Sequence, residues 1–316
     1  MSGSTIRKAL LLLALASTTA CGPSSACKCD GGDVNASIWG ADDGTLLVAG
    51  YTGGDAGFVR TSTGKAFVDG DLFELPVWRI WGSTASDYFV VGGSAGSASV
   101  AHRTAQRVQV WGQSGGTAPV TSALGLWGAS TDAVFVVGAG GAIARFDGLG
   151  WTAQDNAVKE DLRDVWGSAA DDVFAVGRHG TLLHFDGVSW APHESPTTAD
   201  LNAVWGSSAT DVFAVGETEA EQSHVILHYD GEAWSVVHEG AGALLGVHGS
   251  AADRVVAVGG TRNGSSVEAV VLTFDGSEWS ELSSSAGTFL WDVWVSAGGD
   301  RYTVVGPRET LEAQAF

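Results

Sequence analysis

The sequence is poor in methionine, in basic residues and, outside its first 30 positions, in cysteine. One Met and 45 Gly in 316 residues disfavour a helical protein, because Gly destabilises helix interiors. Only 16 Lys and Arg stand against 36 Asp and Glu, which gives a formal charge of −20. A nucleic-acid binder needs clustered cations for phosphate contacts, so we expect no nucleic-acid partner. The hydrophobic content of 45% excludes a disordered chain.

Long hydrophobic runs are also missing, apart from the stretch ALLLLALA at residues 9–16. Its eight residues fall far short of the roughly 20 that a transmembrane helix needs. Arg7 and Lys8 precede it, and small residues follow it. This order of charge, apolar run and small residues predicts a secretory signal peptide over residues 1–20.

The end of this segment resembles the lipobox of bacterial lipoproteins, in which a small residue precedes a lipidated cysteine. Here Ala20 precedes Cys21, and Gly22 follows it. The resemblance implies cleavage before Cys21, lipid attachment to Cys21 and, because no Asp follows, an outer-membrane location with membrane contact through the lipid. Cleavage near Ala20 to a secreted or periplasmic protein is the alternative.

Residues 21–33 are small, polar and rich in Gly, which is typical of a flexible tether between the lipidated cysteine and a folded domain. Cys27 and Cys29 lie in this tether. A disulfide across one residue is strained, and two thiolates leave most of a metal's coordination sphere empty. We therefore expect no metal and no cofactor, and whether the two cysteines pair stays open.

The rest of the chain, residues 34–316, repeats one unit seven times and forms a single predicted domain. The units have an anchor residue at spacings of 39 to 46, namely Trp39, Trp81, Trp127, Trp166, Trp205, His248 and Trp294. A glycine follows eleven positions after each of the first six anchors. Self-similarity at such a period is the signature of a repeat architecture.

Each unit predicts four short strands rich in Val, Ile, Phe and Trp, separated by Gly, Ser, Asp and Thr. The VFAVG segment is apolar at every position, as expected for a strand that is buried on both faces. An Asp-Gly turn and a Trp recur in D-G-x-x-W, which indicates a hairpin between the third and fourth strands. These features predict an all-β propeller of seven blades, each with four antiparallel strands. The last blade has residues for only three strands, and six blades with a C-terminal appendage is the alternative.

The VWGS, DVFAVG and DG-x-x-W pattern over residues 36–316 resembles bacterial VWGS-repeat propeller lipoproteins. These are related to neuraminidase-repeat (Asp-box) propellers and to photosystem II assembly-factor-like propellers. Here Asp and Gly are adjacent, whereas the Asp-box has one residue between them. The resemblance implies a propeller and leaves the activity open.

Candidate chemical groups mostly follow the repeat. His184 and His228 share one repeat position, which Arg145 and Thr273 hold elsewhere, so we expect an exposed strand position rather than a metal ligand. Asp87, Asp172 and Asp211 precede the second strand, where a turn role is favoured over calcium binding. Tyr88, Tyr229 and Tyr302 occupy slots of apolar residues and are expected in the core, and His248 is expected to pack in a Trp slot. No catalytic residues stand out.

The loops between strands 2 and 3 and between strands 4 and 1 vary, and both kinds must lie on one face because they join the same strand ends. Variable loops on one face of a repeat array often mark its binding face. One of them carries Glu217, Glu219 and Glu221, which indicates an acidic rim for cationic partners. We therefore expect a non-enzymatic envelope lipoprotein that binds or scaffolds a protein or a glycan. A surface glycosidase of the sialidase type is the alternative.

Overall fold

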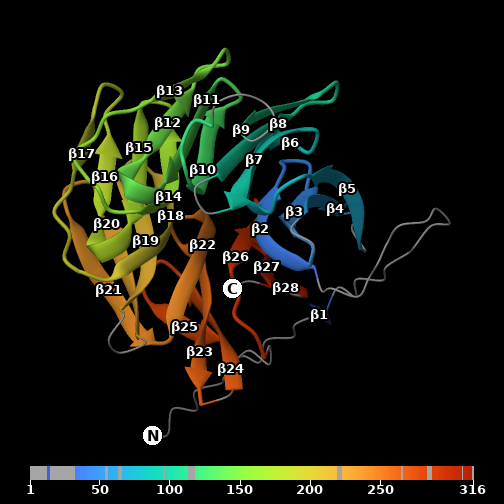
Figure 1. Cartoon of the computed structure of the whole chain (residues 1–316). Coiled ribbons are helices and arrows are strands. Elements are labelled where there is room, and N and C mark those ends of the chain that lie inside the picture. Colours follow the sequence, from blue (N-terminus) through green and yellow to red (C-terminus); the bar gives the residue numbers. More distant parts are fainter. Residues whose placement is uncertain are drawn as a thin grey trace, which may run out of the picture.

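Seven antiparallel sheets of four strands follow one another around a ring in the computed structural model (Figure 1). The structure describes residues 33–314 except 54–55, 63–65, 95–96, 113–117, 219–222, 265, 283–286 and 308, and the backbone of residues 13–14. The predicted seven-bladed all-β propeller is confirmed, and the alternative of six blades with an appendage is wrong. Within the described residues, helical conformation is limited to two 3-10 turns, η1 (Ala139–Gly141) and η2 (Arg178–Gly180).

Each blade takes four strands in chain order from the axis outward, except for the last. Blade 1 contains β2 (Val34–Gly40), β3 (Leu46–Tyr51), β4 (Gly57–Ser62) and β5 (Phe67–Phe73). Blade 2 contains β6 (Val77–Thr84), β7 (Asp87–Ser94), β8 (Ser97–Arg103) and β9 (Val108–Gly112). Blade 3 contains β10 (Ala123–Ser130), β11 (Ala133–Gly138), β12 (Ile143–Phe146) and β13 (Trp151–Ala153). Blade 4 contains β14 (Leu162–Ala169), β15 (Asp172–Gly177), β16 (Leu182–Phe185) and β17 (Trp190–Pro192).

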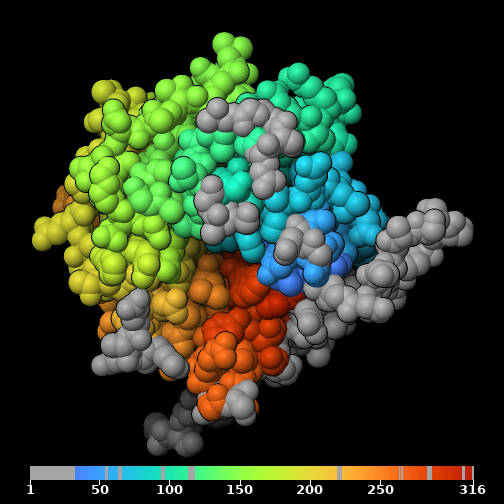
Figure 2. Space-filling model, in the orientation of Figure 1, coloured from blue at the N-terminus to red at the C-terminus, as the bar shows by residue number. Residues whose placement is uncertain are grey.

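The remaining blades close the ring. Blade 5 contains β18 (Asp200–Ser208), β19 (Asp211–Thr218), β20 (Ser223–Tyr229) and β21 (Trp234–Ala241). Blade 6 contains β22 (Ala243–Ala251), β23 (Arg254–Asn263), β24 (Ser266–Phe274) and β25 (Trp279–Leu282). Blade 7 contains β26 (Asp292–Val295), β27 (Arg301–Gly306) and β28 (Glu309–Gln314). The innermost strand β2 contacts β26, so the first and last blades meet, as the blue and red surfaces of Figure 2 also show.

The seventh blade has a fourth strand that the sequence did not predict. The two-residue strand β1 (Leu13–Ala14) pairs with β28 in the register Leu13 with Glu312 and Ala14 with Leu311. Its residues belong to the predicted apolar run of the signal peptide. A third strand at the end of a sheet presents unpaired backbone groups, and an extended segment from the N-terminus satisfies some of them.

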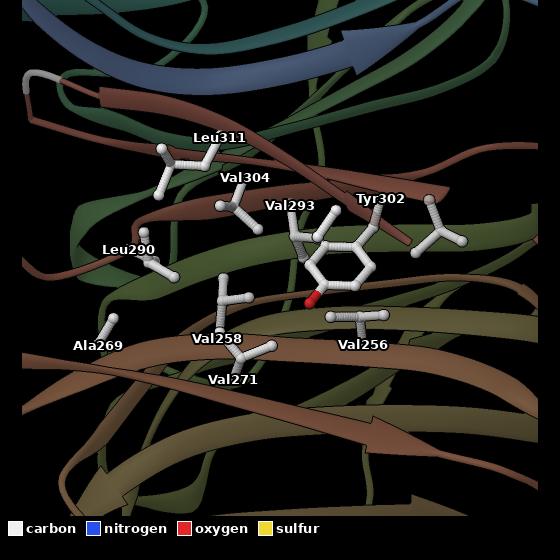
Figure 3. Close-up of a cluster of buried hydrophobic side chains, with 11 residues drawn as sticks. Val256, Val258, Ala269, Val271, Leu290, Val293, Tyr302, Val304 and Leu311 are labelled. Carbon is white, nitrogen blue, oxygen red and sulfur yellow. The ribbon is translucent and has the colours of Figure 1, made fainter. Parts of the chain in front are cut away.

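The second strand of each blade is buried on both faces, as its apolar sequence predicts. β11 is buried at all six positions. Between blades 6 and 7, Val256 and Val258 face Val293 and Val304 across a dry core (Figure 3). Because every blade packs on two neighbours, most of the apolar surface of the chain is buried in such layers between blades.

Five of the six anchor tryptophans cover a glycine of the next blade with their indole. A Cβ added at Gly206 would lie 2.6 Å from Cη2 of Trp166, and one at Gly249 would lie 2.5 Å from Cη2 of Trp205. Gly128, Gly167 and Gly40 are covered in the same way by Trp81, Trp127 and Trp294. The glycine after the anchor in the VWGS motif is therefore required by the indole of the preceding blade.

Blade 6 breaks this pattern, because its anchor is His248. The residue after the next anchor is Val295 instead of glycine, and its N–H donates to Nδ1 of His248 at 3.1 Å. Burial lowers the pKa of His248 to about 3, so the imidazole is neutral and its Nδ1 can accept this hydrogen bond. The expectation that His248 packs in the tryptophan slot is confirmed.

The D-G-x-x-W motif forms an exposed turn in which the Asp side chain holds the backbone. Oδ1 of Asp186 accepts the N–H groups of Val188 at 2.9 Å and Ser189 at 2.8 Å. These bonds lower the pKa of Asp186, since they favour the charged carboxylate. Gly187 has φ of 88°, the left-handed region that the adjacent glycine was expected to supply.

Histidines of the third strand stack on the phenylalanines of the second strand and pair with the Asp that precedes it. The ring centroids are 3.9, 4.5 and 4.6 Å apart for His102 on Phe89, His184 on Phe174 and His228 on Phe213. Nε2 of the same histidines lies 2.8, 2.6 and 2.7 Å from Oδ1 of Asp87, Asp172 and Asp211.

These contacts correct one expectation and extend another. The side chains of His184 and His228 are only 24% and 26% exposed, so they do not occupy an exposed strand position. A π-stacked ring with a carboxylate partner explains why histidine suits this slot. Asp172 and Asp211 have the expected turn role, since Ser168 and Ser207 donate to them, and each also fixes a histidine.

Candidate functional site

The innermost strands carry a β-bulge at the end where the variable loops lie. In β14 the register shifts between Leu162 and Asp164, which leaves Arg163 as the extra residue. The same shift occurs in the innermost strands of five other blades, and the extra residues there are Ala36, Trp78, Leu124, Asn202 and Leu245. A bulge redirects a side chain away from the regular alternation. We call these six positions the bulge ring.

The glycine that follows each anchor by eleven residues makes room for the bulge. A Cβ at Gly177 would lie 2.1 Å from the carbonyl oxygen of Asp161, and a Cβ at Gly216 would lie 2.0 Å from that of Asp200. The chain thus approaches itself too closely for any side chain. The glycine that lies eleven residues after the anchor therefore indicates a bulge in the neighbouring innermost strand and not a turn.

The variable loops of strands 2–3 and 4–1 meet on this face, as their topology requires. The N–H of Gly140 in the 2–3 loop of blade 3 donates to Oδ1 of Asp161 at 2.8 Å. In the next blade the N–H of His179 donates to Oδ1 of Asp200 at 2.9 Å. The two loop types therefore support each other around the ends of the innermost strands.

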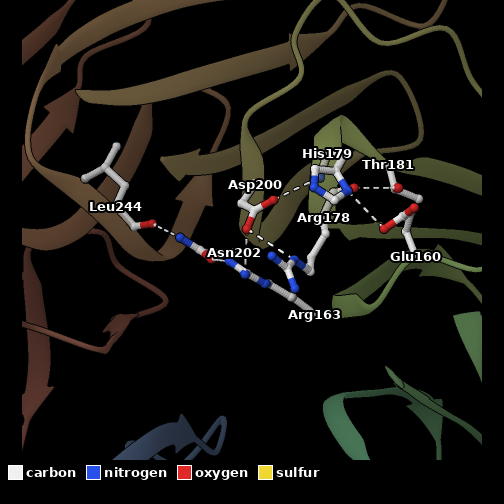
Figure 4. Close-up of polar contacts among 8 residues, drawn as sticks. All are labelled: Glu160, Arg163, Arg178, His179, Thr181, Asp200, Asn202 and Leu244. Carbon is white, nitrogen blue, oxygen red and sulfur yellow. Dashed lines mark hydrogen bonds and ion pairs between the residues drawn. The ribbon is translucent and has the colours of Figure 1, made fainter. Parts of the chain in front are cut away.

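Blades 4 and 5 carry a polar cluster at this place (Figure 4). The buried carboxylate of Asp200 accepts from Nη2 of Arg163 at 2.7 Å and lies 3.5 Å from Nε of Arg178. Arg163 also donates to Asn202, whose Nδ2 donates to the carbonyl of Leu244 at 2.8 Å. The side chains of Arg163 and Arg178 are 28% and 37% exposed, so the cluster holds two cations near the surface of an acidic protein.

His179 lies beside this cluster in a strained conformation. Its φ is 53°, and it is the non-glycine residue with positive φ among those described. The neighbouring blade has Gly140 at the same position, with φ of 67°. Nδ1 of His179 lies 2.9 Å from Oε2 of Glu160, and both side chains are about half exposed. A residue held in the left-handed region persists only where its surroundings support it, and such residues gather at functional sites.

The central channel begins behind the bulge ring. It is a narrow cavity of about 100 Å³, lined by residues of all seven innermost strands. This volume is well below the roughly 300–1,000 Å³ of ordinary ligand pockets, so the channel is small for a ligand. A macromolecular partner is therefore expected at the mouth of the channel.

Two half-buried carboxylates and one arginine line the channel. Oδ2 of Asp292 accepts from Ser37 Oγ at 2.8 Å and from the N–H of Ile38 at 3.0 Å. Oδ2 of Asp164 accepts from the N–H of Val204 at 3.0 Å. Burial raises the pKa of both carboxyl groups, and that of Asp164 reaches about 6, although the positive charge of Arg79 opposes the shift.

The candidate site lies on the face that the variable loops predict, but the sequence analysis did not single out its residues. Glu217 is half-buried and pairs with Asp200 of β18 and with His224 of β20, and Glu219 and Glu221 lie outside the described residues. Cys21 also lies outside them. Arg163, Asp200 and the bulge ring were missed, because one extra residue in a strand that mixes polar and apolar positions, such as LRDVWGSA, leaves no clear break in its alternation. The eleven-residue glycine was the available signal.

Two further findings concern metal sites and membrane-spanning helices. In the part of the chain that the structure describes, no three His, Cys, Asp or Glu side chains gather in a group suited to a metal ion. No helix among the described residues is long and apolar enough to cross a membrane.

Comparisons with known proteins identify the fold class. No protein-family model and no curated protein matches the sequence. The solved structure of YCF48 from Cyanidioschyzon merolae is similar, with a TM-score of 0.64 and 15% identity over 90% of this chain and 96% of that chain. A structure of YCF48 bound to D1 peptide has a TM-score of 0.65 and 13% identity, over 91% of this chain and 95% of that chain. The chain is thus a seven-bladed propeller of the same fold as YCF48, and at these identities the likeness concerns the fold alone.

Proposed function

We propose that the protein is a non-enzymatic binding or scaffolding propeller of the cell envelope, which holds a protein partner at the mouth of its channel. The observation that carries the proposal is the bulge ring, which turns Trp78, Leu124 and Arg163 out at the ends of the innermost strands. All three side chains are partly exposed. Aromatic and arginine side chains at the centre of a face are the residue types that dominate protein interfaces.

The likeness to YCF48 supports a polypeptide partner. One of the similar structures is YCF48 bound to D1 peptide, so a protein of this fold binds a polypeptide. A narrow channel favours a partner that covers the mouth over a polymer that threads it. A glycan remains the second class of ligand.

The charge of the chain selects the kind of partner. The formal charge is −20. Removal of Arg7 and Lys8 with the signal peptide leaves 14 basic against 36 acidic residues, hence −22. A cationic surface on the partner is favoured, with Glu217, Glu219 and Glu221 as the acidic rim. Such attraction weakens as salt screens it.

We also propose that the mature chain is an outer-membrane lipoprotein anchored through Cys21. The sequence of residues 1–21 supports this, and a secreted or periplasmic protein is the alternative. Cleavage before Cys21 would remove β1 and leave β28 at the edge of a three-stranded blade. Mass spectrometry of the mature N-terminus tests the anchor, and a free N-terminus at another residue in a soluble protein would refute it.

Affinity capture from an envelope extract at low and high salt tests the binding function. Leu124→Arg places a charged side chain in the bulge ring, and Val188→Arg makes the same change at a residue that is 87% exposed on the opposite face. The wild type and the Val188 variant should retain the same partner at low salt, and the Leu124 variant should lose it. Equal retention by both variants would refute the site.

A separate assay tests the alternative function, that of a glycosidase. A sialidase-like site needs an arginine cluster and a tyrosine nucleophile. In the described part of the chain, Tyr51 belongs to blade 1 and contacts Trp78, whereas Arg163 and Arg178 belong to blade 4. Turnover of a panel of glycan substrates by the purified protein would reverse the proposal.

A further inference from the structure

The chain enters the ring on the same face as the channel mouth. The first innermost strand, β2, begins at Val34, two residues before Ala36 of the bulge ring. Val34 pairs with Tyr51 at the end of β3, where the variable 2–3 loop of blade 1 begins. The segment that precedes Val34 therefore leaves the folded domain beside the mouth.

Contacts with two blades hold this exit point in place. Nη2 of Arg60 in β4 donates to Oδ2 of Asp33 at 2.5 Å. The N–H of Asn35 donates to the carbonyl oxygen of Pro307, in the loop between β27 and β28, at 3.3 Å. A tether that ends at Asp33 thus starts from a fixed position at the mouth, between blades 1 and 7.

The tether is short compared with the path to the opposite face. Cys21 precedes Asp33 by twelve positions, and twelve residues reach at most about 42 Å when fully extended. A Gly-rich chain of this length spans about 20 Å on average. The path from Val34 to the opposite face runs about 14 Å outward, over the three strand spacings from β2 to β5, and then about 23 Å along the seven residues of β2 (Figure 1). A lipid on Cys21 reaches that face only when the tether is almost fully stretched.

We propose that the lipid anchor holds the channel mouth toward the membrane, and that the partner at the mouth is a cationic segment of a protein embedded in the same membrane. The inference rests on the anchor and the channel-mouth site proposed above. A stretched tether loses conformational freedom, which favours the orientation with the mouth toward the lipid. The D-G-x-x-W turns, where Leu149 and Val188 are 92% and 87% exposed, then face away from the membrane.

The narrow space between the mouth and the membrane selects the partner. A folded domain of 100 residues has a radius of gyration of about 13 Å and hence a diameter of about 34 Å, which takes up most of the reach of the tether. A segment displayed by a membrane protein enters this space without stretching it. The lipid surface itself is a poor ligand, because anionic headgroups repel a chain whose formal charge of −20 becomes −22 without Arg7 and Lys8.

Energy transfer in lipid vesicles tests the orientation. A lipid thioester ligated to the N-terminal Cys21 of the mature chain supplies the anchor whether or not the cell acylates this residue. Failure of the proposed anchor and failure of this inference are therefore separate results. A fluorophore-bearing residue replaces Ala157, which is exposed at the mouth in the 4–1 loop between β13 and β14, or Val188 on the opposite face. With acceptors on the lipid headgroups, position 157 should lie closer to the acceptors by about 20 Å, roughly the length of a blade strand.

A longer tether is the matched control. Insertion of about 30 Gly and Ser residues between Gly32 and Asp33 raises the average span of the tether above the height of the ring, so the two positions should then transfer equally well. The inference is overturned if the two positions transfer equally in the chain without the insertion, or if position 188 lies closer to the lipid.

The identity of the partner is tested in vesicles of zwitterionic phosphatidylcholine. A transmembrane peptide with a lysine-rich exposed end carries the acceptor, and a peptide with glutamates in place of the lysines is the control. Transfer from position 157 should be higher with the lysine peptide, and added salt should reduce the difference by screening. Leu124→Arg in the bulge ring should abolish the difference, and Val188→Arg, with the same change of charge, should leave it unchanged.

Two results contradict this choice of partner. Equal transfer with both peptides, or equal losses in both variants, would show that the mouth does not recognise a cationic segment at the membrane. A closer approach of position 157 to anionic than to zwitterionic lipid, in vesicles without peptide, would assign the mouth to the lipid surface instead.

Discussion

The pairing of His248 with Val295 should behave as one unit that replaces the tryptophan–glycine pair of the other blades. His248→Trp restores the usual anchor but drives its indole into the Val295 side chain, which is only 1% exposed. Val295→Gly restores the usual glycine but leaves a hole beside the smaller imidazole. The double variant rebuilds the arrangement seen between Trp205 and Gly249, where a Cβ would lie only 2.5 Å from the indole.

The magnitudes follow from packing and hydrogen bonding. His248→Trp costs about 1–3 kcal/mol for overpacking and a further 1–3 kcal/mol for the Val295 N–H, which loses its acceptor. Val295→Gly costs about 2–4 kcal/mol, from the lost burial of the side chain and the freedom of glycine in a strand. The double variant should be more stable than the sum of both losses by about 1–3 kcal/mol, as expected for residues in direct contact.

Equilibrium urea unfolding of the four proteins measures this coupling. A matched cycle runs in reverse at the preceding interface, with Trp205→His and Gly249→Val, and should show coupling of the same sign. Additive losses, with a coupling energy below about 0.5 kcal/mol in both cycles, would refute the reasoning.

The same residue gives the cycle a pH signature. The pKa of His248 is about 3 in the folded chain and about 6.5 when unfolded, so below pH 6.5 the unfolded chain binds a proton that the folded chain does not. His248 therefore reduces stability as the pH falls from 6.5 toward 3, by about 1.4 kcal/mol per pH unit. The double variant lacks this loss, so its stability relative to the wild type should rise on acidification. A pH-independent difference would contradict the burial of a neutral imidazole.

Three further predictions concern single residues. Tyr302→Phe should leave the free energy of unfolding unchanged or raise it by about 1 kcal/mol, because the hydroxyl is buried with no hydrogen-bond partner among the described residues. Tyr88→Phe should lower it by about 1 kcal/mol, because the Tyr88 hydroxyl donates to Asp71. Thermal unfolding of the two variants compares these effects. Asp164→Asn should abolish a stabilisation that the wild type gains as the pH falls from 6 to 4. The pKa of Asp164 is about 6 in the folded chain and lower in the unfolded chain, so the folded chain binds an extra proton in this range. If the free energy of unfolding in urea has the same dependence on pH in the variant and the wild type, the idea is wrong. His179→Gly should stabilise the chain by about 1 kcal/mol, since it relieves the positive φ, and a loss in thermal unfolding would show that the side chain contributes more than its strain costs.

The number of blades could be predicted from the sequence because each structural requirement recurs. The inner indole needs a glycine in the next blade, and the bulge needs a glycine eleven residues after the anchor. Each requirement is local and fixed in spacing, so five copies of the first and six of the second make them visible. The fourth strand of the last blade lacked such a pattern, because β1 comes from the opposite end of the chain.

The chemistry could not be predicted with the same success, because side chains at one repeat position have different partners. The sequence shows that His184 and Arg145 hold equivalent positions, and tolerance of both suggested exposure. In the structure both are partly buried on a phenylalanine ring, which accepts an imidazole and a guanidinium equally well. The occurrence of both His and Arg at this repeat position therefore reflects the phenylalanine ring on which either side chain packs.

The places where the repeat fails are therefore the most informative about function. Residues that repeat are occupied with holding one blade on the next, and they are not free to recognise a partner. At the bulge ring the backbone is constant, yet the partly exposed side chain changes from Leu124 to Trp78 to Arg163, as expected where packing does not dictate the residue. This kind of failure leaves blade packing intact, which is how one framework can keep its stability while it acquires a surface for a partner.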